Sequence, residues 1–125
     1  MKWNKTLPVS SVETNELLSI SLDDVLYFKY YENKIQVHTK DEYYLFLLGN
    51  NLNQVLIGLE NSGYYFYKTD RSYAPDLKKV KKLENSFLVC RGYFENVPNS
   101  NSKFFEIANS KYKTVKEIIE NIKED

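Results

Sequence analysis

The chain has 125 residues, enough for one domain, and its hydrophobic, aromatic and charged fractions of 42, 15 and 27% exclude a disordered chain. Its single Cys and single His exclude an internal disulfide and leave too few ligands for a zinc site. No apolar run approaches the roughly 20 residues of a membrane span, so we expect a cytosolic protein with no membrane partner. Seventeen basic and seventeen acidic residues cancel, so binding to nucleic acid would depend on local charge.

Strand-like segments dominate the first half of the chain, at residues 17–22, 23–31, 34–40 and 42–48. In the third, Ile35, Val37 and Thr39 alternate with polar residues, which indicates a strand with one wet face. Polar turns at 32–34 and 40–41 predict antiparallel hairpins. We divide the chain into an N-terminal extension, residues 1–16, and a domain, residues 17–125. The pattern leaves open whether the extension is ordered.

The next segment has a helical period. Leu52, Val55, Leu56 and Leu59 predict an amphipathic helix, with an N-cap within 49–51 and an end at 61–63, where Gly63 permits a left-handed conformation. Residues 64–73 resume a strand pattern, which Pro75 is expected to end with a turn at 74–76. Residues 77–84 fit either a helical turn or a strand.

Two more strands are expected at 87–96 and 103–110, joined by a polar loop, and a terminal helix at 114–125. The helix is predicted from the spacing of four apolar residues, Val115, Ile118, Ile119 and Ile122. The fold class is therefore mostly β with minor α, built from small antiparallel sheets with one internal helix and a C-terminal helix.

Little in the sequence points to catalysis. His38 is the only imidazole, and it lies mid-strand with no nucleophile motif beside it. The carboxylate pairs at 23–24 and 41–42 adjoin turns, and the scattered glycines form no phosphate-binding loop. We expect no enzyme, no cofactor, no metal and no small-molecule substrate.

Residues 68–82 form the one strongly basic segment. On composition alone, a solvated charged surface is favoured, because lysine is normally exposed. The same residue types, with Ser72 and Tyr73 among them, can contact phosphate oxygens, and Arg71 can read guanine bidentately. The basic residues are Lys68, Arg71, Lys78, Lys79, Lys81 and Lys82, against the acids Asp70 and Asp76.

Residues 66–76 read Phe-Tyr-Lys-Thr-Asp-Arg-Ser-Tyr-Ala-Pro-Asp. This stretch resembles the signature of the LytTR DNA-binding domain of bacterial transcription regulators, Phe-x-Arg-x-His-Arg-Ser-Tyr-x-Val-Asn. Residues 107–119 resemble the closing segment of the family, with Ser110 and Tyr112 in place. Residues 20–45 are similar to the opening of the family, which is matched at Asp24, Val25, Tyr27, Phe28, His38 and Thr39. The resemblance covers residues 17–122.

This resemblance implies an elongated LytTR-like sandwich whose loops, rather than a recognition helix, enter the major groove of double-stranded DNA. It assigns base contacts to Asn33, Lys34, Asp70, Arg71, Ser110 and Lys111. It assigns phosphate contacts to Lys68, Ser72, Lys78, Lys79, Lys81 and Lys82. It further implies a cytoplasmic, response-regulator-like protein, here expected to stand alone without a receiver domain. A homodimer on paired sites would compensate for the zero net charge.

Three positions depart from the family pattern. Asp70 stands in place of His, Asp76 in place of Asn, and Lys111 in place of Arg, which loses a planar fork for guanine. These departures support an alternative, a protein-interaction module with a LytTR-like fold that has lost base readout. The Tyr pairs at 30–31, 43–44 and 64–65 would suit such an interface, although one ring of an adjacent pair on a strand usually faces the core.

Overall fold

The computed structural model describes residues 5–60 and 63–124. It has a six-stranded antiparallel sheet in the order β2-β1-β5-β4-β3-β6 and a three-stranded antiparallel sheet in the order β7-β8-β9. The larger sheet contains β1 (Thr6–Ser11), β2 (Leu17–Ser21), β3 (Tyr27–Tyr31), β4 (Lys34–His38), β5 (Tyr43–Phe46) and β6 (Tyr73–Pro75). The smaller sheet contains β7 (Lys82–Asn85), β8 (Cys90–Tyr93) and β9 (Phe104–Ile107), and the helices are α1 (Leu52–Leu59) and α2 (Tyr112–Glu124). The predicted fold class is confirmed.

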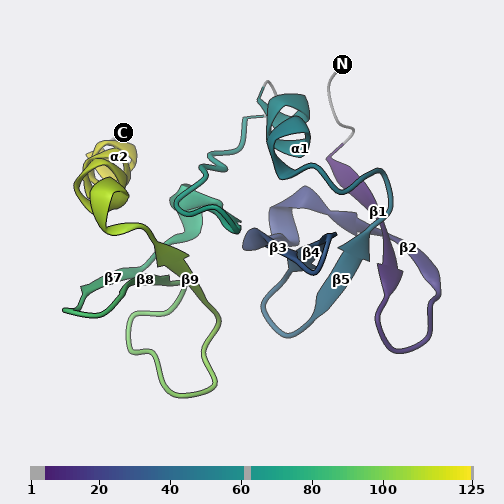
Figure 1. The fold of residues 1–125 in the computed structure, drawn as a ribbon, viewed down its shortest axis with the longest axis horizontal. Helices are drawn as coiled ribbons and strands as arrows, with labels where there is room; N and C mark the ends of the chain where they lie inside the picture. Colours follow the sequence, from purple (N-terminus) through teal and green to yellow (C-terminus); the bar gives the residue numbers. More distant parts are fainter. Residues whose placement is uncertain (1–4, 61–62, 125) are drawn as a thin grey trace.

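The two sheets lie side by side along the long axis of the molecule, and each has one helix on the same side (Figure 1). Under α1, the larger sheet forms a first core from alternate strand residues, as the period of two predicts. Its buried members are Leu7, Val9, Leu22, Val25, Phe28, Ile35, Val37, Phe46, Leu52, Val55, Leu59 and Ala74. Under α2, the smaller sheet forms a second core around Phe105, Ile107, Val115 and Ile119.

Strands β3 and β6 belong to both cores. Successive residues of a strand face opposite sides of the sheet. Phe28 and Ala74 therefore pack in the first core, while their neighbours Tyr27 and Tyr73 pack in the second. Phe28 and Ala74 are also directly paired between β3 and β6, so one pair of strands joins the two halves of the molecule.

The short-range sequence signals are confirmed. α1 occupies the predicted residues, and the Asn51 side chain caps it by accepting from the Gln54 amide at 3.1 Å. The turn after β3 has Glu32 and Asn33 at φ of 50° and 63°, as a two-residue hairpin requires. Of the predicted end of α1 at 61–63, residues 61 and 62 lie outside the described residues, and Gly63 has a φ of 83°.

The C-terminal half also keeps its predicted hairpin and helix. β8 pairs with β9 across a polar loop, and α2 begins at Tyr112, slightly before the expected residue 114. Residue 125, the predicted end of that helix, lies outside the described residues. Within the part of the chain that the structure describes, neither helix is long and apolar enough to cross a bilayer.

The N-terminal boundary differs from the prediction. The sequence sets residues 1–16 apart as an extension, whereas β1 lies inside the larger sheet between β2 and β5. Leu7 and Val9 are fully buried there. The segment has only two branched apolar residues, separated by Pro8 and followed by polar side chains, so its strand pattern is weak. In the structure, residues 6–11 are nevertheless part of the core.

The strand predicted at 64–73 is wrong for most of its length. Residues 64–72 run beside β6, and the amides of Tyr67 and Thr69 donate to the carbonyls of Pro75 and Tyr73 at 3.0 and 3.1 Å. Pro75 is the last residue of β6, so the chain is still extended at 74–75, and the turn expected at 74–76 follows only at Leu77–Lys79. β6 is the edge strand of its sheet, which is where a residue without an N–H is tolerated.

The segment before β8 also departs from the prediction. Residues 77–84 form both alternatives, a 3-10 turn at Leu77–Lys79 and then most of β7. The strand expected from residue 87 begins only at Cys90, because Ser86 holds a turn: its Oγ accepts from the amides of Leu88 and Val89 at 3.3 and 3.2 Å. Phe87 and Leu88 therefore stand at the tip of the β7–β8 hairpin.

Gly92 is required for the packing of the second core. It lies opposite Phe105 in the β8–β9 pair, and a Cβ atom at residue 92 would overlap the buried Phe105 ring. We expect Gly92→Ala to lower the free energy of unfolding by about 1–3 kcal/mol, the cost of overpacking, measured by urea denaturation. In a Phe105→Leu background the same change should cost less, and an equal cost in both backgrounds would contradict the clash.

Candidate nucleic-acid interface

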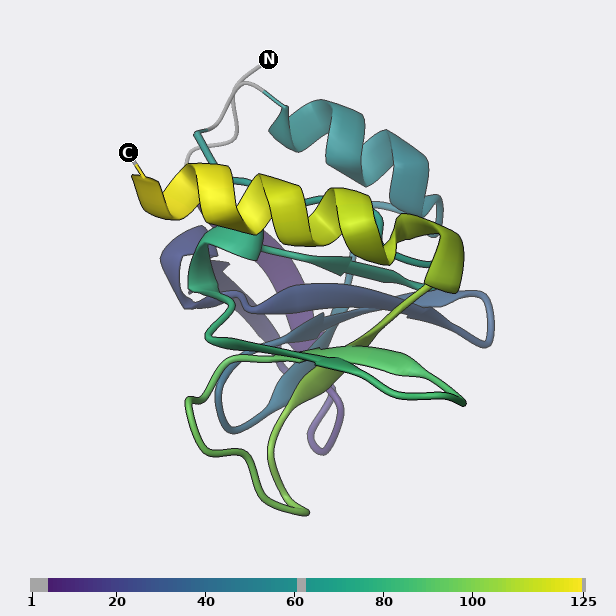
Figure 2. The ribbon, with the colours of Figure 1, turned by 90° about the vertical axis from the view of Figure 1, so that its left-hand side faces the viewer.

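The three predicted base-contact loops lie along one edge of the molecule. They are the β3–β4 hairpin turn, the turn at 70–72, and the 3-10 turn Asn109–Lys111 that leads into α2. Figure 2 shows the β3–β4 turn and the start of α2 on the same right-hand side of the molecule. We call this row of loops the loop edge.

A backbone hydrogen bond joins the second loop to the strand that leads into the first. The Tyr30 amide donates to the Ser72 carbonyl at 2.8 Å, which places the 70–72 turn beside β3. The Tyr30 hydroxyl donates to Asn33 Oδ1 at 3.0 Å, so the side chain of Asn33 is held against its own hairpin. Lys34, its neighbour, is exposed.

The 70–72 turn is held by a hydrogen bond within the turn and by hydrogen bonds from Thr69 to the end of β9. Asp70 Oδ1 accepts from the Ser72 amide at 2.9 Å, the bond of an Asx turn. Thr69, fully buried just before the turn, donates through Oγ1 to the Glu106 carbonyl at 2.8 Å and accepts through its carbonyl from the Ala108 amide at 2.9 Å. These bonds tie the turn to the end of β9.

The third loop is tied to the second. The Lys111 ammonium donates to the Lys68 carbonyl at 3.1 Å, and the Lys68 ammonium donates to Asn53 Oδ1 at 3.0 Å. Both lysines therefore lie on the loop edge, and each ammonium donates one hydrogen bond to another part of the protein. Their positive charge remains available to an anion because neither bond neutralises it.

Three of the predicted base-contact residues have free side chains. Across residues 5–60 and 63–124, no side-chain hydrogen bond or ion pair is recorded for Lys34, Arg71 or Ser110, and all three are exposed. They come from three different loops. The loop edge thus presents one ammonium, one guanidinium and one hydroxyl to a ligand.

A shallow hollow of about 320 Å³ adjoins Arg71. Its lining contains two cations and no acid: Tyr30, Asn50, Asn51, Leu52, Asn53, Lys68 and Arg71. The sequence indicates an N-cap at Asn50 or Asn51 and no role for Asn53. Asn53 and Lys68 are hydrogen-bonded although they lie 15 residues apart in the sequence, so no local pattern indicates that they meet.

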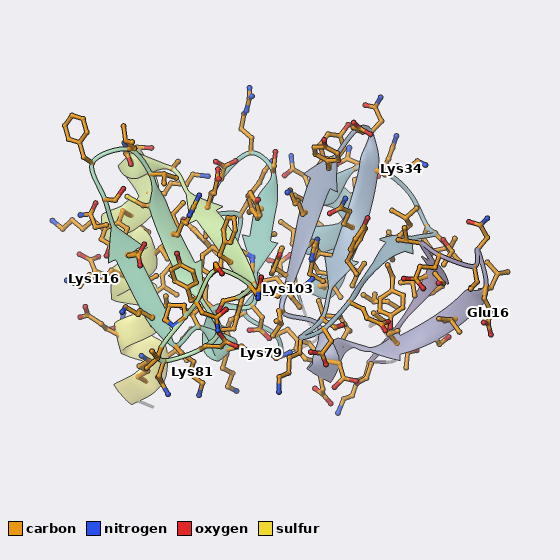
Figure 3. The ribbon with its side chains drawn as sticks, turned by 90° about the horizontal axis from the view of Figure 1, so that it is seen from below. Glu16, Lys34, Lys79, Lys81, Lys103 and Lys116 are labelled. Atoms are coloured by element: carbon orange, nitrogen blue, oxygen red, sulfur yellow. The ribbon has the colours of Figure 1, made fainter. Side chains whose placement is uncertain are left out.

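The basic segment 68–82 does not form one surface. Figure 3 shows Lys34 at the edge opposite Lys79 and Lys81. Lys82 begins β7 at the end away from the hairpin tip, and the Lys78 ammonium lies over the Tyr65 ring, 5.6 Å from its centroid. Lys79, Lys81 and Lys82 are therefore away from the loop edge, and Lys78 packs on Tyr65, whereas Lys68 and Ser72 lie on the loop edge.

Lys79 has a structural role. Its ammonium donates to the carbonyls of Asp23 and Val25, each at 2.6 Å, and lies 3.7 Å from Asp76 Oδ2. Burial lowers the pKa of Lys79, and Asp76 counteracts that shift. These bonds hold the 3-10 turn Leu22–Asp24 against the one at Leu77–Lys79, so Lys79 clamps two turns together, and its predicted phosphate contact stays a prediction.

The two acids that depart from the family pattern are also structural. Asp76 is buried, and its Oδ1 caps the 3-10 turn by accepting from the Lys78 amide at 3.1 Å. Desolvation raises the pKa of Asp76, while Lys79 opposes the rise. Asp76 therefore does not face a ligand, and Asp70 is engaged in its turn.

The Tyr pairs place one ring of each pair against the first core, as expected. Tyr30, Tyr44 and Tyr64 pack against it. Their exposed neighbours are Tyr31, Tyr43 and Tyr65. The alternating pattern therefore accounts for these tyrosines without a partner protein.

His38 joins the two sheets. Its Nδ1 lies 2.9 Å from Lys103 Nζ, its Nε2 lies 2.8 Å from Gln36 Oε1, and its ring stacks on Tyr27 with centroids 4.4 Å apart. Because an ammonium can only donate, Nδ1 accepts and Nε2 carries the proton. Burial, then the charges of Lys103 and Lys29, lower the pKa of His38 to about 3.

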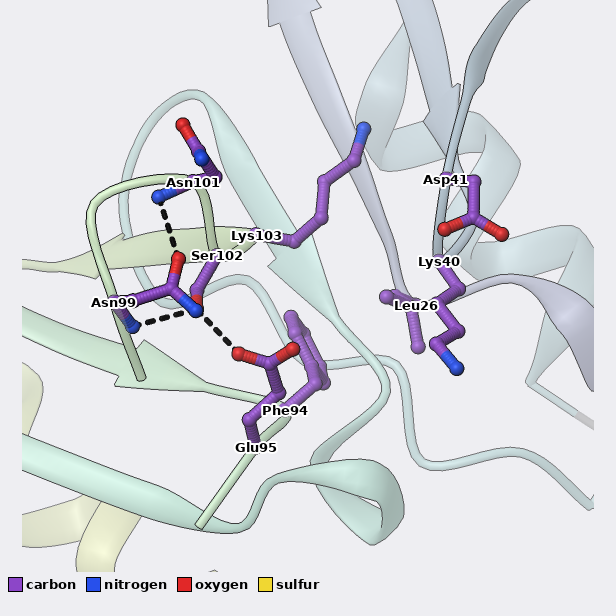
Figure 4. Close-up of a pocket in the computed structure, with 9 residues that line it drawn as sticks. All are labelled: Leu26, Lys40, Asp41, Phe94, Glu95, Asn99, Asn101, Ser102 and Lys103. Atoms are coloured by element: carbon purple, nitrogen blue, oxygen red, sulfur yellow. Dashed lines mark hydrogen bonds between the residues drawn. The ribbon is translucent and has the colours of Figure 1, made fainter. Parts of the chain in front are cut away.

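Lys103 reaches His38 from the loop between β8 and β9. Figure 4 shows Lys103 directed toward the larger sheet across a cavity of about 300 Å³. Ser102 is hydrogen-bonded to Asn99 and Glu95 on the side of the cavity formed by the β8–β9 loop. The Lys103 ammonium also donates to the Glu42 carbonyl at 3.2 Å. This cavity is lined by none of the predicted contact residues.

The clamp formed by Lys79 predicts a loss of stability when it is removed. We expect Lys79→Ala to lower the free energy of unfolding by about 1–3 kcal/mol, because the backbone carbonyls of Asp23 and Val25 and the buried Asp76 lose their partner. The exposed Lys81, two residues away, is the matched control, and Lys81→Ala should stay within about 0.5 kcal/mol of the wild type. Equal urea midpoints for the two variants would contradict the clamp.

The low pKa of His38 predicts acid sensitivity. Unfolded His38 binds a proton near pH 6.5 and the folded residue only near pH 3, so stability is lost as the pH falls through this window. Between pH 7 and pH 5, the wild type should lose about 2 kcal/mol more than His38→Gln, measured by urea denaturation at both values. The same loss in both proteins would show that His38 titrates normally.

Comparison with known proteins identifies the fold and the family. The structure is similar to a solved LytTr DNA-binding domain from Bacillus cereus, described as part of a methyl-accepting/DNA response regulator, with a TM-score of 0.67 and 12% sequence identity over 94% of this chain and 97% of that one. No curated protein matches this sequence. The family model for the LytTr DNA-binding domain matches residues 15–120, and the chain therefore belongs to the LytTR family.

Proposed function

We propose that this LytTR domain binds double-stranded DNA sequence-specifically, as part of a bacterial transcription regulator, by placing the loop edge in the major groove. The observation that carries the proposal is the convergence of three loops that present Lys34, Arg71 and Ser110 without protein partners. Major-groove base edges offer the donor and acceptor patterns that such side chains read. Arg71 is the candidate for bidentate contact with guanine.

Phosphate contacts in this proposal come from fewer cations than the sequence indicated. Lys68 and Lys111 lie on the loop edge beside Arg71, and the Ser72 hydroxyl lies in the same turn. Each neutralised phosphate contributes about −0.9 to the slope of log affinity against log salt. Four cations on the loop edge, Lys34, Lys68, Arg71 and Lys111, would therefore give a slope of roughly −3 to −4.

A second copy of the domain on a paired site would raise the affinity that these few cations give a single copy. The net charge of the chain is zero, so a single domain has no global field that draws it to DNA. Two domains on sites about one helical turn apart would bind with the affinity of a linked pair. This homodimer belongs to the proposal.

The features that favoured the alternative, a protein-interaction module, have structural explanations. Asp76 is buried in a cap, Asp70 is held in an Asx turn, and each Tyr pair buries one ring. None of these features needs a partner protein. We therefore keep DNA binding as the proposed function.

The proposal predicts different effects for two basic residues of the same segment. After selection from a random duplex library at low salt, Arg71→Ala should weaken binding to the enriched duplex and relax preference at one base pair by about 1–3 kcal/mol. Lys81→Ala, at the opposite edge, should leave the affinity and its slope between about 50 and 200 mM salt unchanged. No enriched duplex, or equal losses in both variants, would contradict the proposal.

A further inference from the structure

Two large apolar side chains stand in solvent at the tip of the β7–β8 hairpin. Phe87 is 98% exposed and Leu88 is 85% exposed. Hairpin turns are ordinarily formed by Gly, Asn, Asp and Ser, and here only Ser86 is of that kind. An exposed phenylalanine beside an exposed leucine is therefore a feature that the turn itself does not require.

The tip is ordered by its own hydrogen bonds. The Ser86 amide donates to the Val89 carbonyl at 3.2 Å, and Ser86 Oγ accepts from the amides of Leu88 and Val89. The backbone around Phe87 is thus closed into a tight turn at the end of two paired strands. The two side chains are presented on a rigid support.

The tip continues the loop edge. Cys90 Sγ lies 3.3 Å from Asn85 Oδ1 and 3.2 Å from Asn109 Oδ1, within reach of its one S–H, so the base of the hairpin tip adjoins the 3-10 turn that carries Ser110 and Lys111. In Figure 2 the β7–β8 tip projects to the same side as the β3–β4 turn and the start of α2. In Figure 1 the smaller sheet forms one end of the long axis, so the tip is the outermost member of the row.

The size of the patch distinguishes DNA from a protein partner. A phenylalanine buries about 150–250 Å² at most, whereas a stable protein interface takes about 800 Å² from each partner. Two side chains on a narrow tip are too few for such an interface. They are enough for a wedge between base steps, for which Phe and Leu are the side chains that minor-groove-binding proteins use.

We propose that Phe87 and Leu88 form an apolar wedge that enters the minor groove of the bound DNA beyond the Ser110–Lys111 contact and kinks the duplex there. This inference rests on the proposed function, because the loop edge must face DNA for the tip to reach it. The wedge adds a contact that salt does not screen to an interface with few cations. It also makes affinity depend on how easily the flanking base step unstacks.

The test compares a double variant with a matched control. Phe87→Ala/Leu88→Ala removes the wedge from an exposed site, so the fold is not at risk. Val97→Ala removes a side chain that is also 85% exposed but lies on the loop between β8 and β9, below both sheets in Figure 1. Both variants and Arg71→Ala are titrated with the duplex enriched by the wild type, and the bend is measured by energy transfer between its ends.

The double variant should bind at least about tenfold more weakly and bend the duplex less, with an unchanged salt slope, whereas Val97→Ala should match the wild type. Placing a flexible pyrimidine–purine step at the flank should strengthen wild-type binding but not that of the double variant. Wild-type affinity and bend in the double variant, with Arg71→Ala impaired, would overturn the wedge and leave the proposed function standing. Weaker binding with an unchanged bend would also overturn it, and a wild type that selects no duplex would overturn both.

Discussion

The strand pair β3–β6 is the constraint on which the other parts depend. Phe28 and Ala74 face α1 while Tyr27 and Tyr73 face the second core, so neither core can shift without moving the same two strands. The loop edge begins where these strands end: the hairpin turn follows β3, and the 70–72 turn precedes β6. The spacing between two of the proposed contact loops is therefore set by core packing.

The third loop is positioned by polar bonds rather than by strand pairing. Buried Thr69 joins the 70–72 turn to β9 through two hydrogen bonds, and Lys111 bonds back to Lys68. On the far side, His38 and Lys103 join the two sheets again. A recognition edge built of loops needs such support, because a loop reads bases only if its side chains stay within hydrogen-bond reach of them.

Local signals predicted local structure well. The Asn51 cap, the left-handed pair Glu32–Asn33 and the apolar spacing of α1 each depend on residues within one turn of each other. The failures involve distant partners. Residues 64–72 have strand-like side chains, but Asp70 turns the chain and Thr69 finds its partner at Glu106, 37 residues away. From the sequence, Lys79 is expected to be one more exposed cation, but in the structure its ammonium donates to the carbonyls of Asp23 and Val25, more than 50 residues earlier.

The charge count of a segment and the charge of a surface are therefore different quantities. Residues 68–82 carry a clear positive excess, but the 3-10 turn Leu77–Lys79 redirects the chain and leaves Lys79 and Lys81 opposite Lys34 (Figure 3). The cations that remain on the loop edge would supply only a modest electrostatic affinity. In the proposed function, binding by such an edge would draw on base contacts, on a second copy or on apolar insertion. Each of these depends more on DNA sequence than phosphate attraction does, so a weakly charged edge favours selectivity over tight nonspecific binding.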